Sequence, residues 1–302
     1  MDRRAFLERS ALLAAAGSLI LRKHPPAFAA PAPEIAVARE GSPAALARRA
    51  VDEIGGMRKF VKPGDVVVVK PNIAWDRVPE QGATTNPEVV AEVVRMALEA
   101  GAKKVRVFDF TLNEPRRCYK RSGIEQAARR AGAEVSFVSE RKFKSTAFPE
   151  GEKIRSWEVY EDVLEADRLI NVPAAKHHSV PDAGVSLGMK NLMGVIGGNR
   201  GQFHRDFAPK IADLNARIRP DLIVLDAFRV LTRNGPSGGN LSDVSLRRTV
   251  IAGTDPVAVD AFGATLFSLN PGRIPFLTEA KRRGLGENDL SRVSVRTVNL
   301  GA

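Results

Sequence analysis

Cysteine is almost absent from this 302-residue chain. A single residue, Cys118, excludes an intramolecular disulfide, and it also excludes a cysteine cluster for an iron–sulfur centre or a structural zinc site. Histidine is scarce too, with four residues, and aromatic side chains make up only 6% of the sequence. A chain of this length can nevertheless bury a full hydrophobic core without covalent cross-links.

Long apolar runs are missing as well. A helix that spans a bilayer needs roughly 20 apolar residues. The apolar run near the N-terminus covers residues 11–21 and is interrupted by Gly17 and Ser18. A membrane anchor is the alternative to be weighed for this segment, but the run is too short for one. We expect no stable membrane span in the processed protein.

The same N-terminal segment has the features of an export signal. Arg3 and Arg4 precede the apolar run, and the small residues of Ala27-Phe28-Ala29 follow it. This order is typical of a twin-arginine signal peptide. We therefore predict a signal over residues 1–29, a mature chain that begins near Ala30, and a periplasmic or otherwise exported protein that uses the twin-arginine export machinery as a partner.

The charge is strongly positive. The whole chain carries a net charge of +11, and removing the five basic and two acidic residues of the predicted signal leaves +8. Such a charge attracts small anionic ligands. The basic pairs are scattered along predicted helices and turns with few aromatic residues between them, so we expect no nucleic-acid partner. They are Arg48-Arg49, Arg116-Arg117, Arg129-Arg130, Arg247-Arg248 and Lys281-Arg282-Arg283.

Apolar runs rich in valine and isoleucine alternate with helical patterns, which indicates an α/β fold with a mostly parallel sheet and covering helices. We predict one such domain over residues 30–302, either as a single body or as two lobes with a cleft. Residues 141–155 lack a regular pattern and could leave the core. The expected strands are 35–38, 66–69, 105–108, 134–138, 168–172, 222–225, 249–252 and 293–298.

Three helices have marked beginnings. We predict Asn86 as an N-cap, with Pro87 at the first helical position. Ser42-Pro43 and Asp255-Pro256 predict two further helix starts of the same kind. A further helix is expected over residues 207–218.

Polar residues stand at the ends of four expected strands. Open α/β sheets bind ligands beyond the carboxyl ends of their strands, so these residues predict a site at one edge of the sheet. Charged residues also close strands for purely structural reasons, which is the alternative for any one of them. They are Lys70 and Asn72, then Asp109, then Lys176 with His177 and His178, and finally Asp226.

Three of the four histidines, His177, His178 and His204, share one segment with Lys190 and Asn191. Imidazoles can ligate a metal, with Asp109 or Asp226 as further candidates, or they can transfer a proton. Adjacent histidines on an extended segment point to opposite sides, so at most one of the first pair would face the same ligand as His204. Three-histidine metal binding is therefore less favoured than contact with a substrate or cofactor.

Two glycine-rich loops could cradle an anion or could be plain surface turns. The first, residues 194–201, includes Gly197, Gly198 and Arg200, and the second covers residues 234–240. The segment 184–188 has the G-x-S-x-G form of a serine hydrolase elbow, but it follows a polar turn with a proline, and no acidic residue stands between its serine and His204. We reject the hydrolase interpretation.

Several segments together resemble the family called domain of unknown function 362. They are Val67-Val68-Val69-Lys70-Pro71-Asn72, then Lys176-His177-His178, Met189-Lys190-Asn191 with Gly194, then His204, and last residues 253–261. The resemblance covers nearly the whole mature chain. Many members of that family carry ferredoxin-like cysteine clusters, which this chain lacks, so no iron–sulfur cluster is expected.

A fainter similarity exists to the nickel-pincer lactate racemases. The resemblance implies that Lys190 matches a lysine that contacts their cofactor, that His204 matches a downstream histidine, and that His177 or His178 matches an upstream one. A divalent metal or a metal-containing cofactor is thus one option for this segment.

The sequence predicts an exported α/β enzyme that acts on a small anionic substrate such as a hydroxy or carboxylic acid. Lys70, Lys176 and Lys190 would hold negative charge, with Asn72, Asn191 and Arg200 beside them, and the three histidines would move a proton or bind a metal. The alternative is a non-catalytic periplasmic binding protein for a small anionic ligand.

Overall fold

The computed structural model describes residues 33–180 and 183–301, and these belong to one compact unit. The predicted signal peptide lies outside the described residues. Within the described part of the chain, no helix has the length and apolar character needed to cross a membrane.

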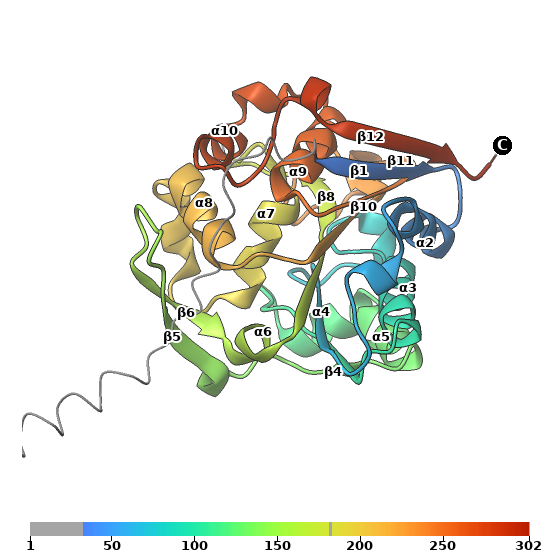
Figure 1. Cartoon of the computed structure of the whole chain (residues 1–302), viewed down its shortest axis with the longest axis horizontal. Helices are drawn as coiled ribbons and strands as arrows, with labels where there is room; N and C mark the ends of the chain where they lie inside the picture. Colours follow the sequence, from blue (N-terminus) through green and yellow to red (C-terminus); the bar gives the residue numbers. More distant parts are fainter. Residues whose placement is uncertain (1–32, 181–182, 302) are drawn as a thin grey trace, which may run out of the picture. The chain divides into compact units, whose positions relative to one another are not determined.

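The centre of the fold is a mixed sheet of ten strands in which parallel pairs predominate (Figure 1). Its main path runs β12, β1, β11, β10, β7, β2, β3, β4, and β8 pairs with β10 and β9. The antiparallel pairs are β1 with β11, β10 with β11, and β8 with β9. The bounds are β1 Glu34–Arg39, β2 Val66–Pro71, β3 Lys104–Val107, β4 Glu134–Val135, β7 Arg168–Val172, β8 Ala174–His177, β9 Val185–Ser186, β10 Leu222–Leu231, β11 Val244–Gly253 and β12 Ser294–Asn299.

Helices cover both faces of this sheet, as the α/β pattern predicts (Figure 1). Those on one face are α2 Pro43–Glu53, α3 Pro87–Glu99, α4 Pro115–Arg121 and α5 Ile124–Arg130. Those on the other are α7 Gly188–Asn191, α8 Phe207–Arg217, α9 Pro256–Thr265 and α10 Pro275–Arg282, with the short α6 Glu161–Glu165. Two 3₁₀ helices contribute residues to the site described below. They are η4 Leu192–Val195 and η5 Arg200–His204.

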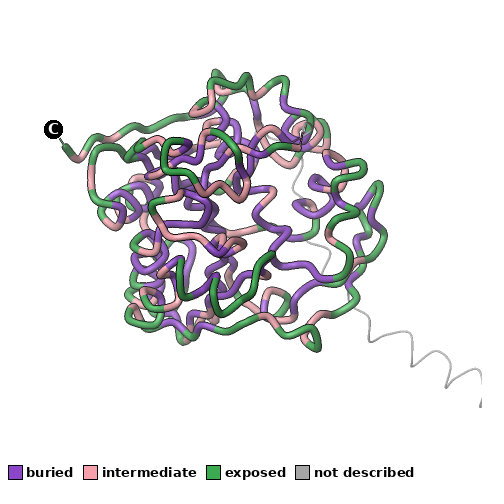
Figure 2. Tube along the Cα trace, turned by 180° about the vertical axis from the view of Figure 1, so that it is seen from behind, coloured by how far each residue is buried: buried purple, intermediate pink, exposed green. Residues whose placement is uncertain are grey.

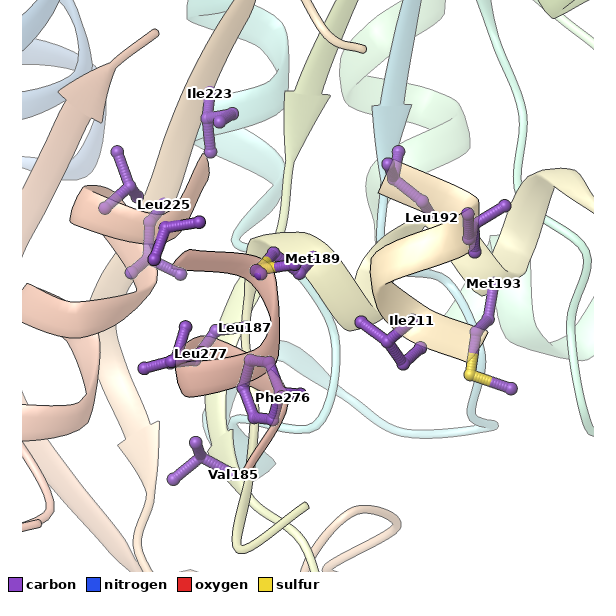
Figure 3. Close-up of a cluster of buried hydrophobic side chains, with 14 of the residues drawn as sticks. Val185, Leu187, Met189, Leu192, Met193, Ile211, Ile223, Leu225, Phe276 and Leu277 are labelled. Carbon is purple, nitrogen blue, oxygen red and sulfur yellow. The ribbon is translucent and has the colours of Figure 1, made fainter. Parts of the chain in front are cut away.

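The strands divide their side chains between two hydrophobic cores, because successive residues of a strand point to opposite faces. Val67 and Val69 of β2 pack with α2 and α3, whereas Val68 packs in the cluster of α7 and α8. The second cluster also contains Met189 of α7 and Leu225 of β10 (Figure 3). The chain is therefore buried mainly along the strands and the inward faces of the helices (Figure 2).

Most of the expected strands are present, but two are much longer than expected. The strand expected over 222–225 continues to Leu231, and the one expected over 249–252 starts at Val244. These two strands, β10 and β11, form a long antiparallel pair. Asp226 interrupts the apolar run of β10, which resumes beyond it, and the added part of β11 is mostly polar and exposed. The strand expected over 134–138 is only two residues long.

Residues 141–155 do leave the main sheet, as their irregular pattern predicts, but they are not without structure. Strand β5 (Phe143–Ala147) pairs with β6 (Ser156–Tyr160) in a separate two-stranded antiparallel sheet. Strand β6 follows residues 141–155, so no pattern within that segment predicts the pairing of β5 with β6.

The three predicted helix starts are confirmed. The side chain of Asn86 accepts a hydrogen bond from the backbone N–H of Glu88, and Ser42 caps α2 in the same manner. Asp255 accepts from two N–H groups of the first turn of α9. Each cap satisfies donors that have no partner inside the helix.

Candidate functional site

One cavity of about 310 Å³ lies beyond the ends of β2, β3 and β8 and is covered by α7, η4 and η5. The outer ends of the strands, α7 and the segment around residue 200 therefore meet at one edge of the sheet, as the positions of the polar residues predict. Its polar lining includes Lys70, Asn72, Asp109, Lys176, His178, Lys190, Asn191, Arg200 and His204.

Lys70 is a fully buried charged residue of the cavity. It lies within β2 rather than after it, on the same face as Val68, and this face packs under α7. Its ammonium forms an ion pair of 2.8 Å with Asp109, and both side chains are almost completely buried. Burial lowers the pKa of Lys70, and the Asp109 carboxylate opposes this effect. Asp109 therefore neutralises Lys70.

Gly194 allows this ion pair to be covered. A Cβ at this position would collide with Asp109 Oδ1 and with the Lys70 ammonium, so the backbone of η4 lies directly on the pair. The carbonyl of Gly194 also accepts a hydrogen bond of 3.0 Å from the N–H of Phe110. Only glycine permits this close approach.

Asn191, the last residue of α7, is the centre of a buried hydrogen-bond network. Its Oδ1 accepts from the Lys70 ammonium and from Asn72 Nδ2, each at 3.0 Å. Its Nδ2 donates to Asn171 Oδ1 at 2.8 Å. Because both ends of the amide are engaged, the orientation of Asn191 is fixed.

Lys176 lies within β8 and points into the same network. Its ammonium donates to Asn72 Oδ1 at 2.9 Å and to the carbonyl of Ala83 at 2.6 Å, and both acceptors are neutral. Burial lowers the pKa of Lys176 from 10.5 to about 7, and the charge of Lys190 adds to this effect. Lys176 is thus a buried cation without an acidic partner among the described residues.

Lys190 contributes a second cation, half-buried, from α7. Its ammonium lies 3.7 Å from the sulfur of Met193 and 5.8 Å from the centre of the Phe207 ring. Burial lowers its pKa to about 8, and the charge of Arg200 adds to the effect. In the part of the chain that the structure describes, no carboxylate pairs with it.

Arg200 adds a third positive charge and also ties two loops together. Its guanidinium donates to the carbonyls of Phe110 at 2.9 Å and Thr111 at 3.1 Å. It also lies 3.9 Å from the centre of the Phe110 ring. Burial lowers the pKa of Arg200, against the attraction of Asp109.

Two of the three clustered histidines, His178 and His204, meet at the cavity with their ring centres 6.0 Å apart. His178 Nδ1 accepts the N–H of Val180 at 3.1 Å, so the neutral ring carries its proton on Nε2. His204 Nδ1 lies 3.3 Å from the carbonyl of Gly201, which can only accept, so its Nε2 is left as an acceptor. One ring therefore offers a donor and the other an acceptor.

The environments of these two rings keep them neutral near pH 7. Burial lowers the pKa of His178 to about 3, and the charge of Lys190 acts in the same direction. Burial and Lys190 also lower the pKa of His204, which lies at the exposed rim.

His177 is not part of this cavity, although it was expected to contribute to the site. Its Nδ1 accepts the N–H of Gly235 at 3.3 Å, and its side chain borders a separate depression formed with Thr232 and Arg247. The reason is the alternation of side chains along the extended segment of β8. Lys176 and His178 border the cavity, and His177 between them points away from it.

Asp226 is also outside the cavity, which corrects its expected place at a strand end. It lies in the middle of β10, and β7 separates that strand from β2. Its carboxylate accepts the N–H groups of Asn86 at 2.7 Å and Phe228 at 2.9 Å. Burial raises the pKa of Asp226 to about 6. These contacts hold the start of α3 and an irregularity of β10, which is a structural role.

The first glycine-rich loop contributes Arg200 to the cavity but not Gly197 or Gly198, which were expected to bind an anion. The N–H of Gly197 donates to the carbonyl of Glu158 at 3.0 Å, and its carbonyl accepts from the indole of Trp157 at 2.9 Å. Both glycines therefore pack against β6. The second loop is held by its carbonyls, which accept hydrogen bonds from Arg77.

The expected metal ligands do not come together among residues 33–180 and 183–301. No group of three or more histidine, cysteine, aspartate or glutamate side chains is arranged there to hold an ion. Of the expected ligands, His177 and Asp226 lie elsewhere, and Asp109 is bound to Lys70 and to the N–H of Ile73 at 2.6 Å. His178 and His204 are the two candidates that the cavity does bring together.

Two sets of residues at the site are not apparent from the sequence. Asp260 of α9 holds the start of α7, although its segment is recognised as part of the family pattern. An apolar wall also lines the cavity, and its residues follow β2, β3 and α7 without any motif. They are Trp75, Phe110, Leu112 and Met193.

The chain is similar to proteins of known sequence and structure. It is 28% identical to the thylakoid-associated protein sll1697 of Synechocystis sp. over 253 residues, which are 81% of this chain and 76% of that protein. It is also similar to the lactate racemase apoprotein from Thermoanaerobacterium thermosaccharolyticum, with 14% identity and a TM-score of 0.44. That match covers 76% of this chain and 56% of the racemase chain, so the chain spans just over half of the racemase's length. The family described as domain of unknown function (DUF362) matches residues 67–265, and the chain belongs to this family.

Proposed function

We propose that this protein is an enzyme that acts on a small anionic substrate, a hydroxy or carboxylic acid, in the cavity at the edge of the sheet. The observation that carries the proposal is an excess of positive charge on one buried and two half-buried side chains. Lys176, Lys190 and Arg200 border one cavity, and among the described residues none of them has an acidic partner. A buried cation without a counter-charge is costly, and a bound carboxylate would supply that charge.

The two lysines are the principal anion ligands in this proposal. Lys176 has used two of its three donors on neutral acceptors, and Lys190 has only the sulfur of Met193. A carboxylate near them would raise the pKa of both ammonium groups and keep them charged. Arg200 contributes mainly charge, since its guanidinium already donates to backbone carbonyls.

The histidines support proton transfer to or from the bound acid. His204 presents Nε2 as an acceptor at the rim of the cavity, which suits a general base, and His178 presents an N–H that can donate to the substrate. Lys190, with a pKa of about 8, can also exchange a proton near neutral pH. Two groups that can exchange a proton, His204 and Lys190, and one hydrogen-bond donor, His178, thus border the same cavity.

The test is to incubate the protein with a panel of short hydroxy and carboxylic acids in D₂O and to follow each acid by proton NMR. An enzyme changes the spectrum of at least one acid, by deuterium incorporation or by conversion. His204→Ala should abolish this change while the circular dichroism spectrum stays that of the wild type. Lys190→Gln should weaken binding of the acid.

Lys120→Ala is the matched control, because this lysine is exposed on α4 and lies outside the cavity lining. Saturable binding of the acids by calorimetry, with no spectral change for any of them, would favour the non-catalytic binding protein. Absence of both binding and conversion would contradict the anion site itself.

We also propose that the protein is exported through the twin-arginine route and acts in the periplasm or outside the cell. The support is the arrangement of Arg3 and Arg4, the short apolar run and Ala27-Phe28-Ala29 in the sequence.

A further inference from the structure

We infer that the anionic substrate carries an apolar group, aromatic or branched aliphatic, of about the size of a phenyl ring. This inference rests on the proposed function and specifies its substrate class. It follows from the depths at which the buried lysines and the apolar side chains lie within one cavity.

Two of the lysines lie at the inner end of the cavity, since Lys70 and Lys176 have exposed fractions of 0% and 1%. Lys190 and Arg200 are half-buried and lie nearer the mouth. The apolar side chains lie further out, since Trp75 and Phe110 are half-buried and Leu112 is 57% exposed. A ligand that fills this cavity therefore meets Lys176 at its inner end, and toward the solvent it meets apolar surface beside Lys190 and Arg200.

The apolar wall is held in place by contacts within the chain. The N–H of Leu112 donates to the carbonyl of Ala74 at 2.9 Å, which joins the segments that follow β2 and β3. The Phe110 ring contacts the Arg200 guanidinium and also the Phe143 ring, whose centre is 5.4 Å away. A preformed wall costs little ordering on binding, so it can contribute directly to affinity.

The size of the cavity agrees with such a ligand. Its volume of about 310 Å³ reaches the lower end of the range of cavities that bind larger organic molecules. A short hydroxy acid held by the lysines would leave Trp75 and Leu112 in contact with water. An exposed leucine beside a half-buried aromatic ring at the mouth of a cavity is the kind of apolar surface that a ligand covers.

The experiment compares three probes by calorimetry with the wild-type protein. Propanoate carries the anion alone, phenylpropanoate adds the ring, and phenylpropanamide keeps the ring without the charge. We expect phenylpropanoate to bind at least about tenfold more tightly than propanoate, because the ring is removed from water. Phenylpropanamide should bind more weakly than phenylpropanoate.

Leu112→Ala should reduce the preference for phenylpropanoate over propanoate. The matched control is Leu246→Ala, which removes a leucine of similar exposure, 53%, outside the cavity lining. This control should keep the wild-type preference.

The outcomes separate the two proposals. Equal affinities for propanoate and phenylpropanoate, both above that of the amide, would contradict the inference that the substrate carries an apolar group. They would agree with the anion site. Equal affinities for phenylpropanoate and phenylpropanamide would contradict the anion site on which the proposed function depends. A preference for phenylpropanoate that is the same in Leu112→Ala and the wild type would contradict the inference that the apolar wall contacts the ring of the ligand.

Discussion

The side chain of Asp260, on α9, accepts a hydrogen bond of 2.7 Å from the backbone N–H of Gly188, the first residue of α7. Its other oxygen accepts from the N–H of Met189 at 2.9 Å. A Cβ on Gly188 would lie 2.8 Å from the Asp260 carboxylate, so glycine is needed for this contact. Because α7 carries Lys190 and Asn191, Asp260 positions two residues of the site without touching the cavity.

Asp260→Asn should change how stability depends on pH. Burial raises the pKa of Asp260 to about 7, far above that of an unfolded aspartate. Between roughly pH 4 and 7 the folded state therefore binds more protons than the unfolded state, so the free energy of unfolding falls as the pH rises through this range. We expect titration of Asp260 to lower the free energy of unfolding of the wild type by about 2–4 kcal/mol over this range. Asp260→Asn should not show this loss.

Urea unfolding from pH 4 to 8 measures this effect as the difference between the variant and the wild type. Asp52→Asn is the control, because Asp52 is exposed on α2. An identical pH dependence in Asp260→Asn and the wild type would show that the carboxylate does not titrate in this range.

Asn72→Ala and Asp226→Ala should have opposite consequences. Asn72 accepts from Lys176 and donates to Asn191, so its loss should weaken binding of propanoate more than it affects stability. Asp226 satisfies two buried N–H groups away from the cavity, so its loss should cost about 1–3 kcal/mol of stability and leave binding intact. Thermal unfolding measures the stability of both variants, and calorimetry measures their affinity for propanoate. Weakened binding in a stable Asp226→Ala variant would contradict the structural role.

The sheet and the edge at which the site lies can be predicted from the sequence, because these depend on local patterns. Valine-rich strands alternate with capped helices, and caps such as Asn86 act within a few residues. The direction of each polar side chain depends on longer-range pairing. Asp226 looks like a strand end because its charge interrupts the apolar run of β10, although the strand continues beyond it. Gly197 looks like an anion ligand because β6, the strand it contacts, has no clear pattern.

The sequence does not reveal the apolar wall for a related reason. Trp75 lies in one segment and Phe110 and Leu112 in another, and the three share no spacing, so only folding brings them to the cavity that Lys190 lines. The alternation of His177 and His178, by contrast, is a property of any extended segment and can be argued from the sequence.

Arg3 and Arg4 should be required for export. Changing both to lysine keeps the charge but removes the feature that the twin-arginine machinery recognises, so the precursor should accumulate in the cytoplasm. Cell fractionation with immunoblotting measures the distribution, and mass spectrometry of the exported wild type should place its first residue near Ala30. Arg9→Lys is the control. Normal export of the double variant would contradict the twin-arginine assignment.

The affinity for propanoate should fall as the pH rises above about 8. Burial lowers the pKa of Lys190 to about 8 and that of Lys176 to about 7 in the absence of a ligand, and only the ammonium forms attract a carboxylate. Binding of the anion raises both pKa values, so proton uptake accompanies binding, and the affinity declines by up to about tenfold per pH unit for each lysine that must be protonated.

Calorimetry from pH 6 to 10 measures this dependence, and buffers with different ionisation enthalpies report the proton uptake. Lys190→Gln should bind more weakly at pH 7 and should show a shallower decline at high pH, since one of the two titrating cations is gone. Lys120→Gln, at the exposed surface of α4, should follow the wild type. An affinity that stays constant from pH 7 to 10 in the wild type would show that neither lysine supplies the charge that holds the acid.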